Sequence, residues 1–132
     1  MSPDSNADPL RDAAVLIVED DYMVAHSLEF LLNAHGCRVV GMAPTVEAAL
    51  ALAEREAFDV AILDVHLRGG SVAPFAEELA RRGHPFVFLT GYADLEALPD
   101  ALRRHPRLDK PVAADLLVAT LARLIGAKRA KP

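Results

Sequence analysis

Several short apolar runs in this chain are each followed directly by side chains that could do chemistry. These reactive positions are Glu19-Asp20-Asp21, Asp64, Thr90 and Lys110-Pro111. Carboxylates held close together repel one another, so they do not all stay ionised easily. A hard divalent cation such as Mg²⁺ removes this repulsion, prefers oxygen ligands and keeps water positions open for a phosphate. Asp64 could then attack phosphorus, while Thr90 donates a hydroxyl hydrogen and Lys110 supplies a positive charge.

Each of these residues, taken alone, has an ordinary structural role. An acidic pair after a strand is commonly found at a helix N-terminus, where it complements the helix dipole. Asp64 could begin a loop, Thr90 could occupy a turn and Lys110 could face solvent. Their shared position after successive strands favours a single phosphorylation site, because chance agreement is the poorer explanation.

The spacing of apolar residues predicts the elements that position these side chains. Three of the four stronger strand candidates are continuous apolar runs, which is typical of parallel strands covered on both faces. The expected strands are Ala14–Val18, Arg38–Met42, Val60–Leu63, Phe86–Leu89 and Arg107–Asp109. Each is followed by a segment of helical periodicity, so the order is (βα)5 and the fold class is α/β. Such an order predicts a five-stranded parallel sheet with helices on both faces.

Helix boundaries are indicated by residues with known preferences at helix ends. Thr45 can cap the second helix at its N-terminus, and Gly36, Gly83 and Gly126 suit positions just beyond helix ends. The fourth helical segment, residues 94–104, is expected to be short and broken because it contains a proline.

Ligands of an open parallel sheet bind outside the carboxyl ends of its strands, where the reactive residues lie.

Length and composition exclude several other classes of protein. The 132 residues correspond to one domain, and the net charge of −5 argues against a nucleic-acid partner. Cys37 is the single cysteine, which excludes an internal disulfide framework and a multi-cysteine zinc site. The longest apolar run, Ala13–Val18, is too short to span a bilayer, and no signal peptide is evident.

We therefore expect a cytoplasmic protein with no membrane partner. Its domain covers residues 13–126, between a disordered N-terminal tail at 1–12 and a C-terminal tail at 127–132.

Three motifs resemble those of the receiver domains of two-component response regulators. They are Val15-Leu16-Ile17-Val18-Glu19-Asp20-Asp21, Ile62-Leu63-Asp64-Val65-His66-Leu67 and Asp109-Lys110-Pro111. They are similar to the family's first-strand acidic motif, its phosphoacceptor motif and its lysine–proline motif. The resemblance covers residues 13–126 and implies the flavodoxin-like receiver fold, with strand order 2-1-3-4-5.

The resemblance also implies a role for each site residue. Asp64 would accept phosphate from a sensor histidine kinase or a histidine phosphotransfer protein. Mg²⁺ (or Mn²⁺) would be bound by Asp20, by Asp64 and by the backbone carbonyl of His66, while Glu19 would act through water. Thr90 and Lys110 would hold phosphoryl oxygens, and the Lys110–Pro111 bond would be cis, which X–Pro bonds tolerate. Such a protein is a phosphoacceptor that catalyses only its own phosphotransfer and dephosphorylation, and is not otherwise an enzyme.

The segment Pro85-Phe86-Val87-Phe88-Leu89-Thr90-Gly91-Tyr92 is similar to the P-F-x-F-x-T-G-Y signature of a subgroup of single-domain receivers, the FAT GUY receivers. Leu89 stands where the subgroup usually has alanine. Membership would imply a receiver without a DNA-binding output domain, acting through a downstream protein partner or a phosphorelay. Leu116 and Val118, beside the apolar stripe of the last helix, are interpreted as part of a dimer or partner face.

One position departs from the family pattern. Many receivers carry an aromatic switch residue three positions before the lysine, where this chain has Arg107. A guanidinium does not slide between buried and exposed rotamers as a Tyr or Phe ring does. Our hypothesis is that Tyr92, or an ion pair of Arg107, replaces this switch, with Thr90 as the third switch candidate.

Two alternative functions remain open from the sequence. An aspartyl-phosphate phosphohydrolase could use a similar sheet, but such enzymes resemble D-x-D-x-T, and Asp64 is followed by Val65 and His66. A degenerate receiver could bind partners without being phosphorylated, although the intact acidic pair, Thr90 and Lys110 argue against it.

Overall fold

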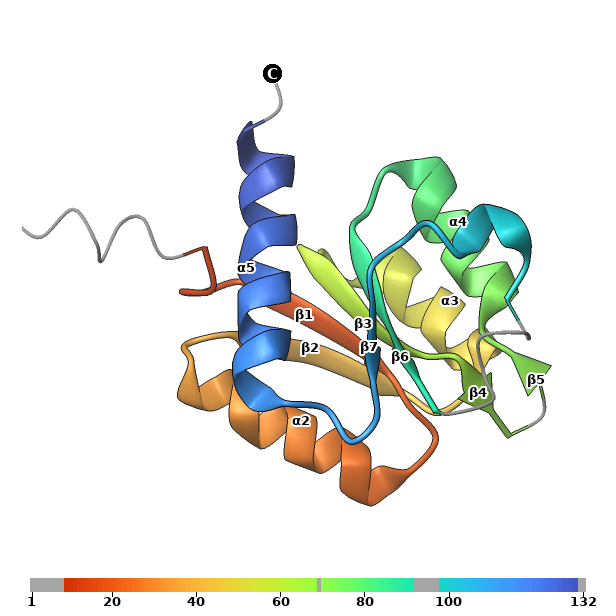
Figure 1. Ribbon diagram of the computed structural model, residues 1–132, viewed down its shortest axis with the longest axis horizontal. Coiled ribbons are helices and arrows are strands. Elements are labelled where there is room, and N and C mark those ends of the chain that lie inside the picture. Colours follow the sequence, from red (N-terminus) through yellow and green to blue (C-terminus); the bar gives the residue numbers. More distant parts are fainter. Residues whose placement is uncertain (1–8, 69, 92–97, 131–132) are drawn as a thin grey trace, which may run out of the picture.

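A five-stranded parallel sheet forms the centre of the computed structural model, which describes residues 9–68, 70–91 and 98–130. The strands follow the order β2-β1-β3-β6-β7, and every neighbouring pair is parallel. Counted among the strands of this sheet alone, the order is 2-1-3-4-5, so the predicted fold class and strand order are confirmed. Figure 1 shows the sheet between two layers of helices.

The elements agree closely with those predicted. The strands of the central sheet are β1 (Ala14–Val18), β2 (Arg38–Ala43), β3 (Val60–Asp64), β6 (Phe86–Thr90) and β7 (Arg107–Asp109). The helices are α2 (Tyr22–Ala34), α3 (Val46–Arg55), α4 (Ala73–Arg82) and α5 (Ala114–Ala130), with a 3-10 helix η2 at Asp100–Leu102. A two-stranded antiparallel hairpin, β4 (His66–Leu67) with β5 (Gly70–Ser71), lies between β3 and α4.

Each face of the sheet has its own apolar core. Residues of α3 and α4 pack on one face and residues of α2 and α5 on the other (Figure 1). Alternate side chains of β1 divide between the two cores, with Leu16 on the first side and Ile17 on the second. Every residue of β1, β3 and β6 is buried, which explains why these strands appear in the sequence as continuous apolar runs.

The predicted helix ends are largely confirmed. The hydroxyl of Thr45 accepts a hydrogen bond from the Ala48 N–H at 3.1 Å, which satisfies a free donor at the start of α3. Gly83 ends α4 with φ of +77°, a left-handed conformation that favours glycine. Cys37 is buried directly before β2.

An irregularity in β2 brings the sheet close to α3. The register between β1 and β2 shifts after Val15, which pairs with Val39, so that Leu16 pairs with Gly41. A Cβ atom on Gly41 would lie 2.7 Å from the Leu52 side chain of α3. Glycine at this bulge therefore allows α3 to pack directly against β2.

The predicted disordered tail at residues 1–12 is wrong in its last part. Residues 9–12 form a turn, Leu10 is only 2% exposed in the α2–α5 core, and the Asp12 N–H donates to the Gly36 carbonyl at 2.8 Å. A single leucine among polar residues has no periodicity, so its burial left no pattern in the sequence. Residues 1–8 lie outside the described part of the chain.

The predicted C-terminal tail at 127–132 is also wrong as far as it is described. Helix α5 passes through Gly126 and continues to Ala130. A glycine inside a helix costs about 1 kcal/mol, which packing can offset, and Lys128 and Arg129 complement the negative helix end. The guanidinium of Arg129 also donates to the Pro9 carbonyl at 3.4 Å, which ties the end of α5 to the N-terminal turn.

The expected weak helix at residues 94–104 is only partly visible. Its described part contains η2 preceded by Pro99, in keeping with a short and broken helix, and residues 94–97 lie outside the described chain. None of the helices within residues 9–68, 70–91 and 98–130 is long and apolar enough to cross a membrane.

We predict that Leu10→Ala will lower the free energy of unfolding by about 2–4 kcal/mol, because it leaves a cavity in the α2–α5 core. Urea denaturation followed by circular dichroism measures this change. Arg11→Ala is the matched control, since Arg11 is an exposed neighbour. Equal stability of the two variants would show that the N-terminal turn does not belong to the core.

Candidate functional site

The register of the parallel strands brings their carboxyl ends to one edge of the sheet. Val18 pairs with Leu63, Asp64 pairs with Leu89, and Thr90 pairs with Asp109. The residues that follow β1 and β7, and the last residues of β3 and β6, therefore lie beside one another. The sequence prediction of a shared edge is confirmed by this register.

Three acidic side chains form a compact cluster at this edge. Oxygen atoms of Glu19, Asp20 and Asp64 all lie within 4.8 Å of one another. Glu19 is 4% exposed and Asp64 is 3% exposed, so two of the three carboxyl groups are shielded from water. Burial at such distances strengthens the repulsion between the carboxylates.

Lys110 provides the cation next to this cluster. Its Nζ lies 3.0 Å from Oδ1 of Asp64 and 3.7 Å from Oε1 of Glu19. The backbone fixes its position, since the Lys110 N–H donates to the Thr90 carbonyl at 2.9 Å, and the bond to Pro111 is cis as expected. The ammonium thus contacts the predicted phosphoacceptor directly.

The pKa of the Glu19 carboxyl group reflects its burial and the charges around it. Its pKa is raised to about 7, first by burial and then by hydrogen bonding and charge repulsion from Asp64. The Asp21 N–H, which donates to Oε2 at 3.0 Å, and the Lys110 charge act in the opposite direction without restoring an ordinary pKa. The site therefore disfavours the charged form of the Glu19 carboxyl group in the absence of a further cation.

The donor set fits a hard divalent cation. Oε1 of Glu19 is fully buried and lacks a hydrogen-bond partner among the described residues, although such groups are normally satisfied. The clustered groups are all carboxylates, the oxygen ligands that Mg²⁺ and Mn²⁺ prefer. Glu19, Asp20 and Asp64 are the residues predicted for metal binding, and the structure brings all three together.

Two further predicted site residues border the acidic cluster. The His66 N–H donates to Oδ1 of Asp64 at 3.3 Å, so the backbone at His66 lies beside the phosphoacceptor, while its side chain is exposed. Thr90 is buried at the end of β6, and its hydroxyl lies 3.4 Å from Oδ1 of Asp109. Their roles toward a metal and a phosphoryl group remain predictions.

Of the switch candidates, Arg107 and Thr90 lie within the described residues, and Tyr92 does not. Arg107 is exposed, and its guanidinium donates to the backbone carbonyl of Arg103 at 2.8 Å. Within the described part of the chain the guanidinium of Arg107 contacts this nearby carbonyl and forms no ion pair, and both forms of the switch hypothesis stay predictions.

Sequence reasoning missed the contact between Arg68 and Asp20. Oδ2 of Asp20 accepts the Arg68 N–H at 2.5 Å, and Nε of Arg68 lies 3.7 Å from the same oxygen. The main contact is made by the backbone N–H of Arg68, which any residue other than proline could supply, so the residue type does not indicate it.

Asp21, which had no assigned role, caps α2. Its side chain accepts hydrogen bonds from the N–H groups of Met23 and Val24 at 2.9 and 3.2 Å.

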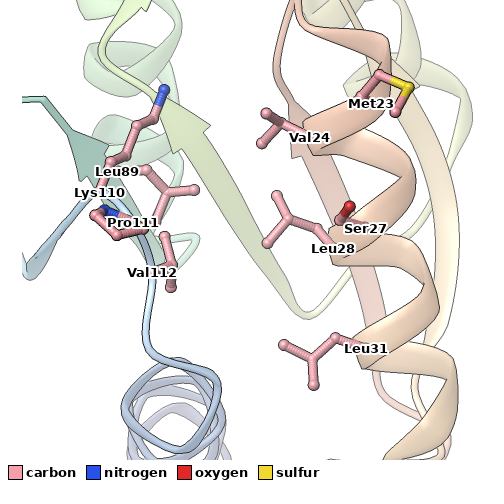
Figure 2. Close-up of a pocket in the computed structure, with 9 residues that line it drawn as sticks. All are labelled: Met23, Val24, Ser27, Leu28, Leu31, Leu89, Lys110, Pro111 and Val112. Atoms are coloured by element: carbon pink, nitrogen blue, oxygen red, sulfur yellow. The ribbon is translucent and has the colours of Figure 1, made fainter.

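An apolar groove of about 400 Å³ adjoins the site between α2 and the segment after β7. Figure 2 shows Val24, Leu28 and Leu31 of α2 across from Pro111 and Val112. Lys110 also lines this groove, which links the groove to the acidic cluster.

Leu116 and Val118, predicted as a dimer or partner face, differ in exposure. Leu116 is 55% exposed, while Val118 is partly buried against the α2–α5 core. Of the two, only Leu116 is therefore an exposed apolar side chain, and dimerisation stays a prediction.

Comparison with known proteins places this site in a defined family. The sequence model for the response regulator receiver domain matches residues 15–122. The transcriptional regulatory protein PdtaR of Mycobacterium tuberculosis is 30% identical over 100 residues, which cover 75% of this chain and 49% of PdtaR. The chain thus spans about half the length of the curated relatives it matches.

Solved structures support the same relationship. The solution structure of SdrG from Sphingomonas melonis Fr1 is 42% identical, covers 86% of this chain and 96% of its own, and has a TM-score of 0.75. A second structure, the BeF3-activated conformation of SdrG from Pseudomonas melonis Fr1, is 42% identical with a TM-score of 0.72, covering 87% of this chain and 98% of its own. PhyR from Brucella abortus is 27% identical with a TM-score of 0.76, and covers 96% of this chain but 53% of its own.

We predict that Glu19→Gln will raise the free energy of unfolding at pH 8 in the absence of divalent cations, by about 1–3 kcal/mol. The native pKa of Glu19 is raised above the unfolded value, so its stabilising contribution is complete below about pH 4.5 and is lost as pH rises toward 7. The advantage of the variant should therefore disappear at low pH. Urea titrations in EDTA across this range measure the difference.

Glu77→Gln, at an exposed position on α4, is the control for this pH series. It should show no comparable pH-dependent gain. A Glu19→Gln advantage that does not change with pH would contradict the assignment of a raised pKa.

Proposed function

The chain belongs to the response regulator receiver family, and on this basis we propose that it accepts a phosphoryl group on Asp64 from a phosphohistidine. The donor would be a sensor histidine kinase or a histidine phosphotransfer protein. The observation that carries the proposal is the buried Asp64 carboxylate, 3.0 Å from the Lys110 ammonium and clustered with Glu19 and Asp20.

The proposed step is an in-line displacement at phosphorus. A carboxylate oxygen of Asp64 forms a bond to phosphorus while the bond from phosphorus to the donor imidazole nitrogen breaks. The electron pair of that bond stays on the imidazole, which takes up a proton. The product is an acyl phosphate on Asp64, and no oxidant or further reactant is needed.

The protein groups around Asp64 each contribute to this transfer. The Lys110 ammonium offsets negative charge on a phosphoryl oxygen, because a point charge on a flexible stem suits a phosphate. The Thr90 hydroxyl, next along β6 from the Asp64 partner Leu89, would donate to another oxygen. Preorganised donors of this kind stabilise charge at low reorganisation cost.

Mg²⁺ (or Mn²⁺), held by Asp20 and Asp64 with the His66 carbonyl and with Glu19 through water, would neutralise charge when bound. The raised pKa of Glu19 and its buried oxygen, which lacks a hydrogen-bond partner among the described residues, support this assignment, because a bound cation would favour the ionised carboxylate. The same residues argue against a phosphorylation-independent receiver, since the complete acidic set has no evident structural need.

The output would be a shift in conformational population toward a form that binds a protein partner. SdrG, which is similar to this chain, has a BeF3-activated conformation, and this supports an equivalent activated form here. We further propose that the protein acts through a downstream protein or a phosphorelay, in the cytoplasm, and does not turn over an external substrate.

Asp64→Asn should abolish covalent phosphorylation, because an amide oxygen is a poor nucleophile and forms no stable acyl phosphate. Intact-protein mass spectrometry after incubation with Mg²⁺ and acetyl phosphate, and with phosphorylated kinases of the source organism, measures the product. Asp115→Asn, an exposed position in the first turn of α5, should remain fully phosphorylated. Undiminished labelling of Asp64→Asn would overturn the proposal, and catalytic turnover of acetyl phosphate without a trapped intermediate would favour a phosphohydrolase.

Thr90→Val should slow phosphorylation about 10–100-fold, because it removes a buried donor aimed at the transferred group while nearly preserving side-chain volume. Thr90→Ser retains the hydroxyl and should stay within a few-fold of the native rate. Rates come from a time course of phosphorylation with acetyl phosphate. If both variants slow equally, packing at this position matters and the hydroxyl does not.

A further inference from the structure

Besides Lys110, Arg68 places a positive side chain at the acidic cluster. It follows β4 directly, in the segment that leads to β5, and its side chain is 86% exposed. Its backbone N–H and its guanidinium both address the same oxygen, Oδ2 of Asp20, at 2.5 and 3.7 Å. Asp20 thus has a cationic partner supplied by the chain itself.

The two cations divide the carboxyl groups between them. Lys110 lies against Asp64 and Glu19, whereas Arg68 lies against Asp20. Asp20 belongs to the set that would hold a divalent cation. A dication bound there would meet the guanidinium at short range, where like charges repel.

We propose that Arg68 is a built-in counter-cation of Asp20, which lowers the affinity of the site for a divalent cation by competing for this carboxylate. The inference rests on the metal site of the proposed function. It makes Arg68 a positioning residue that sets how much Mg²⁺ is needed before phosphoryl transfer, without contact to the phosphorus.

The structure also provides a place for the displaced guanidinium. A cavity of about 360 Å³ lies between the start of α3 and the β4–β5 hairpin, and it is lined by Arg68 together with Glu47. Arg68 already lines this space, so its side chain has only to turn away from Asp20 to occupy it. The Glu47 carboxylate is then available as an alternative partner of the same charge type as Asp20.

The test is the affinity of the 132-residue chain for Mg²⁺, measured by isothermal titration calorimetry without any phosphodonor. Arg68→Gln keeps the backbone N–H to Asp20 and removes only the charge. We expect it to bind Mg²⁺ roughly threefold to tenfold more tightly than the native chain. Because the guanidinium is exposed, the gain should shrink toward zero in about 1 M salt, where the Debye length is about 3 Å.

Two control variants isolate the local charge. Arg68→Lys retains a cation and should bind Mg²⁺ close to the native affinity. Arg55→Gln changes the net charge equally, but at the opposite end of α3, and should also leave the affinity close to native. Thermal unfolding in EDTA verifies that all variants are folded.

The outcomes separate this inference from the proposed function. If the native chain binds Mg²⁺ and Arg68→Gln matches Arg55→Gln, or binds more weakly, the competition is overturned while the metal site stands. If neither the native chain nor any variant binds Mg²⁺, the metal site of the proposed function is overturned, and the competition with it. A gain for Arg68→Gln that persists unchanged in high salt would also overturn the electrostatic argument.

Discussion

The carboxyl groups of Glu19, Asp20 and Asp64 share one small volume, and the groups around them offset the resulting repulsion. Lys110 reaches Asp64 from the segment after β7, and Arg68 reaches Asp20 from the end of β4. The charged form of Glu19 remains disfavoured, mainly by burial, as its raised pKa shows. Incomplete compensation of the repulsion between these carboxyl groups favours metal binding. A cluster already neutralised by its own side chains would have little affinity for a metal.

The sequence was sufficient to predict the sheet and the acidic cluster, and the physical reason is the same for both. Buried parallel strands must be apolar on both faces, so β1, β3 and β6 appear as uninterrupted apolar runs whose ends are easy to locate. A parallel register then requires the residues after those ends to meet at one edge. The convergence of Asp64 with Glu19 and Lys110 follows from this topology without knowledge of any loop.

Features that depend on single contacts could not be predicted in this way. Leu10 enters the core from a polar segment, and a lone apolar residue has no periodicity to reveal it. Gly126 suggested a helix end, yet α5 continues, since the cost of one glycine is small against the packing of a long helix. The β4–β5 hairpin has two residues in each strand, and the Arg68 N–H to Asp20 is a backbone contact. Neither leaves a signature in residue type.

The contact between the Arg129 guanidinium and the Pro9 carbonyl has a consequence for access to Asp64. It places the last turn of α5 beside the segment that leads into β1, at the amino edge of the sheet (Figure 1). The acidic cluster lies at the carboxyl edge, a full strand length away. Pro9 and the last turn of α5 therefore leave the edge that carries Asp64 open to an approaching protein.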